Sequence, residues 1–159
     1  MLALPSLAAA AACPCRQSQD VVIVFDASYK NDASSLDTSI NVVLTALVEE
    51  LSGPDSATQI ALVAFAGSVS ACNPYSDCAT VLTGLTSDAS TLTAAITGRG
   101  VSGGDRCTSC GIEMALQLLR SGRVAAGATV LLLTNGVQNI GGDDQKAVDK
   151  SELLVVCTA

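Results

Sequence analysis

Residues 21–28 read Val-Val-Ile-Val-Phe-Asp-Ala-Ser, and the rest of the chain is best understood from this stretch. Five apolar residues follow one another without polar alternation, which is typical of a strand buried on both faces of a parallel sheet. In open α/β sheets, ligands bind beyond the carboxyl ends of the strands. Asp26 and Ser28 therefore stand where such a fold binds its ligand, although both residue types are also common in turns.

Other segments of the chain show a similar strand pattern, and helical segments lie between them. Apolar runs at 60–65, 129–134 and 153–157 have the length of buried strands, and 79–85 is a shorter, alternating one. Ser34 and Asp37 resemble a capping box at the start of a helix over 34–51. The apolar stripe predicted for this helix consists of Leu36, Ile40, Val43, Leu44, Leu47, Val48 and Leu51.

Two further helices are predicted in the second half of the chain, at 88–97 and from Thr108 onward, with a short polar helix before 153. The first turns Leu92, Ala95 and Ile96 inward. In the second, Thr108 is expected to be the N-cap, and the inward residues are Ile112, Ala115, Leu116 and Leu119.

This order predicts a three-layer, doubly wound α/β fold with a mostly parallel sheet and helices on both faces. One antiparallel edge hairpin is expected, with its loop at 72–78. The chain stops directly after a buried strand, so we expect the domain to be truncated at its C-terminus. We assign residues 1–15 to a signal-like apolar segment and 16–159 to one domain.

Composition excludes several classes of function. The net charge is −7 and no basic cluster occurs, which argues against nucleic-acid binding. The chain contains no His, so Ser-His and Cys-His catalytic pairs are excluded, and with them many hydrolase mechanisms. No later stretch reaches the roughly 18 apolar residues that a membrane span needs. The sequence favours a protein that is not an enzyme.

Export is predicted from the amino terminus and from the cysteines. Leu and Ala dominate residues 1–12 as in a secretory signal, although the usual basic start is missing. We therefore expect a secreted or cell-surface protein, in which disulfides form. Cys72 and Cys78 bracket a short turn-rich loop that a bridge between them would close. The alternative is that one of these two reaches the Cys107/Cys110 loop, and the pairings of Cys13, Cys15 and Cys157 stay open.

The segment Cys107-Thr108-Ser109-Cys110 has three interpretations. A Cys-x-x-Cys at a helix start can be a thiol-disulfide centre, because the helix N-terminus lowers the pKa of a thiol. The spacing also fits half of a zinc site. In an exported, cysteine-rich chain we favour a structural role.

Three loop signals resemble those of von Willebrand factor A-type domains, over about residues 20–157. Asp26-Ala27-Ser28-Tyr29-Lys30 stands where that family has Asp-x-Ser-x-Ser, and Thr134-Asn135-Gly136 where it has Thr-Asp-Gly. Thr108 matches a ligand Thr before a central helix. The resemblance implies a metal-ion-dependent adhesion site in which Ser28 and Thr108 coordinate Mg²⁺ while Asp26 and Asn135 hold metal-bound water. An open coordination position would then take an acidic side chain of a partner.

Two departures predict that this site is degenerate. Lys30 puts a cation where the family has a hydroxyl, and Asn135 replaces a carboxylate with a neutral amide. Lys30 either pairs with Asp26 or extends into solvent, and Asp32 and Asp105 are nearby acids that compensate. We expect Mg²⁺ or Ca²⁺ to bind weakly or not at all. The alternative is that Asp26, Ser28, Thr108 and Asn135 only hydrogen-bond the loops together.

The sequence thus predicts a noncatalytic interaction or adhesion module in a cell-surface or matrix assembly. Its partners would be other extracellular proteins, bound at the face around the four candidate ligands. Two alternatives remain. One is a structural subunit of a surface filament with a non-functional metal site, and the other is a thiol-disulfide redox protein that uses Cys107 and Cys110.

Overall fold

The structure, a computed structural model, describes residues 18–28, 33–52, 57–66, 78–99, 107–124, 126–134 and 152–158, without the side chains of 33–39 and 152–158. Its elements follow in the order β1 (Ser18–Asp26), α1 (Ala33–Leu51), β2 (Ala57–Phe65), β3 (Ala79–Thr86), α2 (Ala89–Gly98), α3 (Thr108–Arg120), β4 (Gly127–Thr134) and β5 (Glu152–Thr158). Each coincides within a few residues with a predicted segment. The polar helix expected before 153 and the segment 1–15 lie outside the described residues.

The five strands form one sheet in the order β3-β2-β1-β4-β5. β1 pairs in parallel with both β2 and β4. β3 is antiparallel to β2, which confirms the predicted hairpin, but β5 is also antiparallel to β4. The α/β fold is therefore confirmed. The sheet has an antiparallel strand at both edges, whereas only one antiparallel edge was predicted. A short apolar run such as 153–156 fits either direction, so its sequence could not settle this point.

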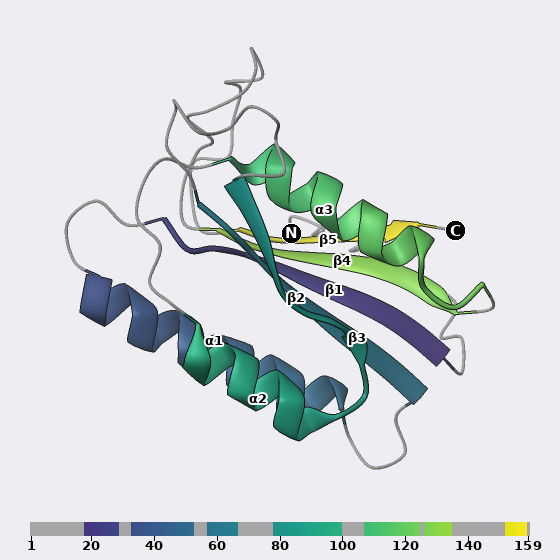
Figure 1. Ribbon diagram of the computed structural model, residues 1–159, viewed down its shortest axis with the longest axis horizontal. Helices are drawn as coiled ribbons and strands as arrows, with labels where there is room; N and C mark the ends of the chain where they lie inside the picture. Colours follow the sequence, from purple (N-terminus) through teal and green to yellow (C-terminus); the bar gives the residue numbers. More distant parts are fainter. Residues whose placement is uncertain are drawn as a thin grey trace, which may run out of the picture.

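Helices cover both faces of the sheet, α1 and α2 on one side and α3 on the other (Figure 1). Alternate residues of β1 serve the two cores. Ile23 and Phe25 pack in the cluster with Leu44 of α1 and Leu92 of α2. Val24 packs in the cluster that includes the buried face of α3. Because β1 is central and buried on both faces, its last residues are held in a fixed place.

The stripe predicted for α1 is confirmed in its centre and wrong at its margin. Leu44 and Val48 are fully buried, and Ile40, Leu47 and Leu51 pack against the same core. Val43, however, is 46% exposed. With 100° per residue, Val43 lies about 80° around the helix from the centre of the stripe, beyond the reach of the sheet. The side chains of Leu36, Ser34 and Asp37 lie outside the described ones.

An ion pair anchors the end of α3 to the amino edge of the sheet. Asp20 of β1 is buried, and its two carboxylate oxygens accept from the backbone amide of Arg123 at 2.7 Å and from its Nε at 2.8 Å. Arg123 Nη2 also donates to the carbonyls of Gln19 at 2.7 Å and Ala57 at 2.9 Å. α3 therefore runs back across the sheet, from the carboxyl edge to the amino edge.

The described helices include none that combines the length and the apolar character needed to cross a membrane.

Candidate functional site

Asp26 ends β1 as a buried carboxylate at the carboxyl edge of the sheet. Its Oδ1 accepts from the backbone amide of Ser28 at 2.9 Å and from the Ser28 hydroxyl at 2.5 Å. Its Oδ2 accepts from the hydroxyl of Thr134, the last residue of β4, at 3.4 Å. These donors compensate the loss of water around a buried carboxylate. The structure thus places Asp26 and Ser28 together at the strand end, and their role as ligands of a cation stays a prediction.

The loop that follows Asp26 is also tied to β2. The backbone amide of Ala27 donates to the carbonyl of Phe65, the last residue of β2, at 2.9 Å. Ser28 is 1% exposed, and because its hydroxyl proton points to Asp26, its oxygen keeps lone pairs for another partner. The loop thus presents a carboxylate and a hydroxyl oxygen in a fixed arrangement.

Thr108 begins α3 at the same edge of the sheet (Figure 1). It is half-buried, and its hydroxyl has no hydrogen-bond partner in the part of the chain that the structure describes. The prediction that Thr108 is the N-cap is wrong, because Cys107 holds that position and makes no side-chain capping bond. The Thr108 hydroxyl is therefore not used to cap the helix.

The placement of Thr108 relative to Asp26 follows from the contact between α3 and the sheet. A Cβ on Gly111 would lie 2.6 Å from Val24 Cγ1 and 3.0 Å from Phe65 Cδ1, so the helix backbone touches both strands there. Thr108 lies one turn before Gly111, about 4.5 Å along the helix axis. Asp26 lies two residues beyond Val24, about 6.6 Å along β1. Thr108 and Asp26 therefore both lie beyond this contact on the side of the carboxyl edge of the sheet.

Thr108 also shares the sheet-facing side of α3. Residues three and seven positions apart lie on one face of a helix. Gly111 and Ala115, at those spacings from Thr108, are buried against the sheet. The inward stripe predicted for α3 was therefore partly wrong. Small residues make the closest contact, while Ile112 and Leu119 pack at its margin and Leu116 is only half-buried.

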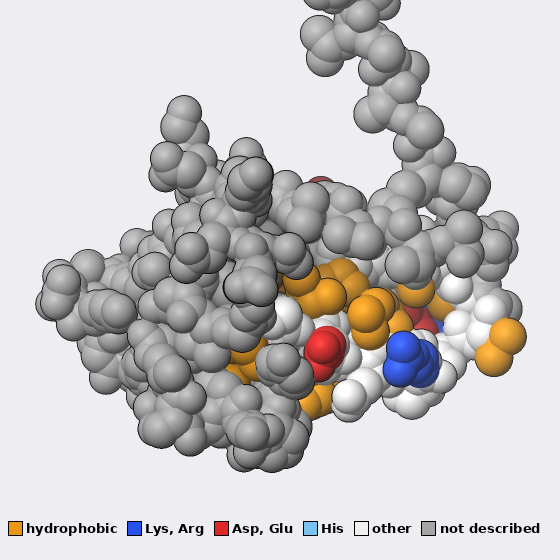
Figure 2. All heavy atoms as spheres, turned by 90° about the horizontal axis from the view of Figure 1, so that it is seen from above, with side chains coloured by type: hydrophobic (Ala, Val, Ile, Leu, Met, Phe, Trp, Pro, Cys, Tyr) orange, Lys and Arg blue, Asp and Glu red, His pale blue; other side chains and the backbone are white. Residues whose placement is uncertain are grey.

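The outer side of α3 mixes residue types. Figure 2, seen from above α3, shows hydrophobic side chains beside acidic and basic ones on the described part of the surface. This agrees with the half-buried Met114 and Leu118 and the exposed Glu113 and Arg120 of α3. The helix presents its small residues to the sheet and leaves its larger aliphatic side chains partly exposed.

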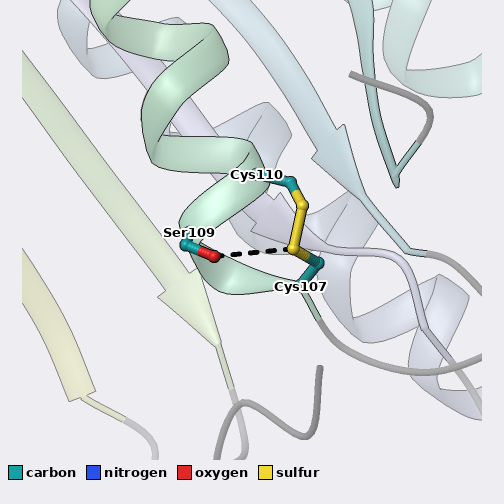
Figure 3. Close-up of a disulfide and its surroundings, with 3 residues drawn as sticks. All are labelled: Cys107, Ser109 and Cys110. Atoms are coloured by element: carbon teal, nitrogen blue, oxygen red, sulfur yellow. Dashed lines mark hydrogen bonds between the residues drawn. A yellow bond between two sulfur atoms is a disulfide. The ribbon is translucent and has the colours of Figure 1, made fainter. Parts of the chain in front are cut away.

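Cys107 and Cys110 form a disulfide across the first turn of α3, with their Cα atoms 5.3 Å apart (Figure 3). Both are buried, in one cluster with Val24 and Phe65. The two sulfurs are bonded to each other, so neither serves as a zinc ligand, and a bridge from either to Cys72 or Cys78 is excluded. The burial of both sulfurs agrees with the structural role that the sequence favoured for this segment.

Other predicted residues fall partly or wholly outside the described part of the chain. Cys78 is in a second disulfide, whose partner is outside the described side chains. The Cys72–Cys78 bridge therefore stays a prediction, as do any bridges of Cys13, Cys15 and Cys157. Lys30 and Asn135 lie outside the described residues as well, and so do Asp32 and Asp105.

The donor set that the structure describes suits a hard cation held loosely. One carboxylate and the hydroxyls of Ser28 and Thr108 are oxygen ligands of the kind that Mg²⁺ accepts together with water. Within the described ranges, no three His, Cys, Asp or Glu residues gather into a metal-binding group. These residues would therefore hold a cation mainly through hydroxyl and water oxygens, because the described side chains supply only the one carboxylate of Asp26.

Two contributors to the site were missed from the sequence. Thr134 was noticed only as part of a motif, yet its hydroxyl contacts Asp26. The pairing of Phe25 with Leu133 already places the next residues of β1 and β4 side by side, but this register is not visible in the sequence. Gly111 was not singled out, because nothing in a helical pattern tells which glycine touches the sheet.

Comparison with known proteins identifies the fold. The sequence matches the von Willebrand factor type A domain over residues 20–153, while no curated protein matches it. The fold resembles the vWF domain of the type V pili tip protein Mfa5 from Porphyromonas gingivalis, with a TM-score of 0.61 and 19% identity over 76% of this chain and 38% of that chain. It also resembles the pilus adhesin SpaC from Lactobacillus rhamnosus GG in an open conformation, with a TM-score of 0.60 and 17% identity over 78% of this chain and 15% of that chain.

At these identities the structural likeness shows the fold alone, and this chain spans 38% or less of either matched structure. The family match, by contrast, extends from within β1 into β5 and so includes Asp26, Ser28 and Thr108. The chain belongs to the von Willebrand factor type A domain family.

Proposed function

We propose that this chain is a noncatalytic interaction module that binds another protein of a cell-surface or extracellular assembly through the carboxyl edge of its sheet. The observation that carries the proposal is the oxygen cluster of Asp26 and Ser28 at the end of β1, at the edge of the sheet where α3 begins. The family membership supports it, and the names of two structural neighbours, a pilus tip protein and a pilus adhesin, agree with it.

An extracellular setting is supported by the chemistry of the chain. Disulfides persist in oxidising compartments, and the structure holds the Cys107–Cys110 bridge and a second one at Cys78. The apolar segment at residues 1–12 has the composition of an export signal. Both features fit secretion or surface display.

The charges at this edge suit an acidic partner together with a divalent cation. When bound, the cation would offer an open coordination position to a carboxylate. Asp26 gives one negative charge, and the hydroxyls of Ser28 and Thr108 are neutral, so a second acid from the partner would strengthen the binding of both. Lys30 in the same loop opposes this, which is why affinity for the ion alone should be weak.

The two alternatives have less support. Attack on a disulfide needs access to a sulfur, and Cys107 and Cys110 are 0% and 2% exposed. A purely structural subunit would need no ligand at the carboxyl edge, so it predicts that this edge makes no specific contact.

Site-directed photo-crosslinking separates the docking proposal from these alternatives. A photoreactive amino acid replaces Ser109, half-buried at the carboxyl edge, and, as the matched control, Val124, fully exposed beyond Arg123 at the amino edge. Each chain is presented to intact cells that carry the natural protein. We expect adducts with one defined protein from position 109, and their loss with EDTA or with Asp26→Ala. Adducts from both positions alike, or from 124 only, would contradict the proposal.

Calorimetry with Mg²⁺ and Mn²⁺ tests the predicted weakness of the cation site. Lys30→Ser combined with Asn135→Asp removes a positive charge and adds a carboxylate, so we expect the double variant to bind either ion at least about tenfold more tightly than the native chain. Tight binding by the native chain would show that Lys30 does not oppose the ion. No gain in the variant would mean that these loops do not meet around a cation.

A further inference from the structure

The first turn of α3 is closed by a covalent bond instead of a polar cap. The N-cap of a helix is usually Ser, Thr, Asp or Asn, whose side chain accepts from an unpaired backbone amide. Here Cys107 makes no such bond, and its carbonyl accepts from the amides of Cys110 at 3.1 Å and Gly111 at 3.4 Å. The disulfide to Cys110 holds the same turn shut.

This turn is fixed to the sheet as well as to itself. Cys107 and Cys110 are buried in the cluster with Val24 and Phe65, and a Cβ on Gly111 would lie within 3.0 Å of both of those side chains. On the other side of the turn, Ser109 points its hydroxyl toward Cys107 Sγ at 3.5 Å (Figure 3). Because a disulfide sulfur carries no proton, the hydroxyl is the donor in this contact.

Thr108 lies within the four-residue loop that this disulfide closes. Its hydroxyl has no hydrogen-bond partner within the described residues, although the turn around it is held by the disulfide and by packing. A hydroxyl on a fixed turn that has no partner within the described residues is available to an external ligand. The oxygens of Asp26 and Ser28 lie at the same edge.

We propose that the Cys107–Cys110 disulfide is a positioning element of the cation and docking site, which fixes the Thr108 hydroxyl beside the oxygens of Asp26 and Ser28. This inference rests on the proposed function, because it concerns the same edge of the sheet. Opening the bridge leaves Thr108 in a turn without a cap and lowers the affinity for a divalent cation. Supporting residues around metal ligands typically change affinity about tenfold or more.

Four proteins test the coupling between the bridge and the hydroxyl. They are the native chain, Thr108→Val, Cys107→Ala/Cys110→Ala and the triple variant. Mn²⁺ is titrated against each, and the concentration that half-broadens the NMR signal of the Ala27 amide, in the loop after β1, is measured. This readout suits weak binding, because it needs no enzymatic activity and no partner protein.

We expect the double alanine variant to need about tenfold more Mn²⁺ than the native chain, and the triple variant to need less than twofold more than Thr108→Val. A similar loss in both backgrounds would show that the bridge does not act through Thr108 and would overturn the proposal. An absence of loss, or of any Mn²⁺ response in the native chain, would overturn it too. Crosslinking from position 109 tests the docking function separately, so the docking proposal and the positioning proposal can fail independently.

A control separates positioning from a general loss of stability. Arg123→Met removes the ion pair with Asp20 at the amino edge and should destabilise the fold without changing the Mn²⁺ response. An equal change in that variant would contradict the positioning role. If the double alanine variant fails to fold, a dithiol reductant opens the bridge in the native chain. The pair then takes up two electrons and two protons while the reductant becomes a disulfide, and alkylation with mass spectrometry confirms which cysteines were reduced.

Discussion

Replacing Gly111 by Ala tests how closely α3 approaches the sheet. A glycine inside a helix normally gains up to about 1 kcal/mol of stability when it becomes alanine. At Gly111 the new Cβ would lie 2.6 Å from Val24 Cγ1 and 3.3 Å from Phe65 Cβ. Val24 is β-branched and fully buried in the central strand, so neither its rotamer nor its backbone can yield easily.

The balance of these two effects gives the expected size. Overpacking a buried site costs about 1–3 kcal/mol, and contact with two strands puts this case in the upper half of that range. After the gain in helix propensity, we expect a net loss of about 1–2 kcal/mol in the free energy of unfolding. For a chain of 159 residues this is a fall of about 2–8 °C in the thermal midpoint.

Urea unfolding followed by far-UV circular dichroism measures the change, and Gly98→Ala is its matched control. Gly98 is the last residue of α2, and a Cβ there meets nothing within 4 Å. The control should be neutral or more stable by up to about 1 kcal/mol. The reasoning fails if Gly111→Ala is as stable as the native chain, or if Gly98→Ala loses as much.

Three further outcomes follow from other contacts. Arg123→Met leaves the buried carboxylate of Asp20 without its guanidinium and should lower the free energy of unfolding in urea by about 1–3 kcal/mol. This is less than for a fully buried pair, because the Arg123 side chain is 37% exposed. A loss near zero would contradict the expectation. Cys107→Ala/Cys110→Ala should lower the free energy of unfolding by about 2 kcal/mol, as expected for a four-residue loop, and a loss above about 4 kcal/mol would point to collapse of the surrounding core. The pKa of Asp88 is lowered from 3.8 to about 2, chiefly by the Thr91 hydroxyl and then by the Ser90 hydroxyl, so its contribution is complete above pH 3.8 and is lost as the pH falls through about 2. Thr91→Val should raise that pKa toward 3.8 in a carboxyl NMR titration, and an unchanged value would refute the assignment.

The sequence was sufficient for the fold because its strongest signals are local. An unbroken apolar run marks each of the central strands, and the 3.6-residue period marks α1. Direction and close contact are different, since they depend on parts of the chain that meet only after folding. The antiparallel pairing of β5 with β4 and the ion pair between Asp20 and Arg123, 103 residues apart, are of this kind.

The site was predictable to the extent that it follows from the strand-end rule. Asp26 and Ser28 were identified because a buried strand stops at them, and Thr108 because it matches the Thr that the family has before a central helix. The role of Cys107 as N-cap was missed because propensity favours a hydroxyl at that position, whereas a disulfide closes the turn here. Thr134 was missed because its contact with Asp26 depends on the order of strands in the sheet.

The two acids of β1 have contrasting environments, which supports different roles for the two edges of the sheet. Asp20, at the amino edge, is matched by the guanidinium of Arg123, so its charge is neutralised within the fold. The donors to Asp26, at the carboxyl edge, include the amide and hydroxyl of Ser28 and the hydroxyl of Thr134, which are neutral. Neutral donors satisfy carboxylate oxygens without cancelling their charge. The sequence predicts that Lys30 competes with a divalent ion for the carboxylate of Asp26, so we expect residue 30 to set how strongly this edge binds a cation.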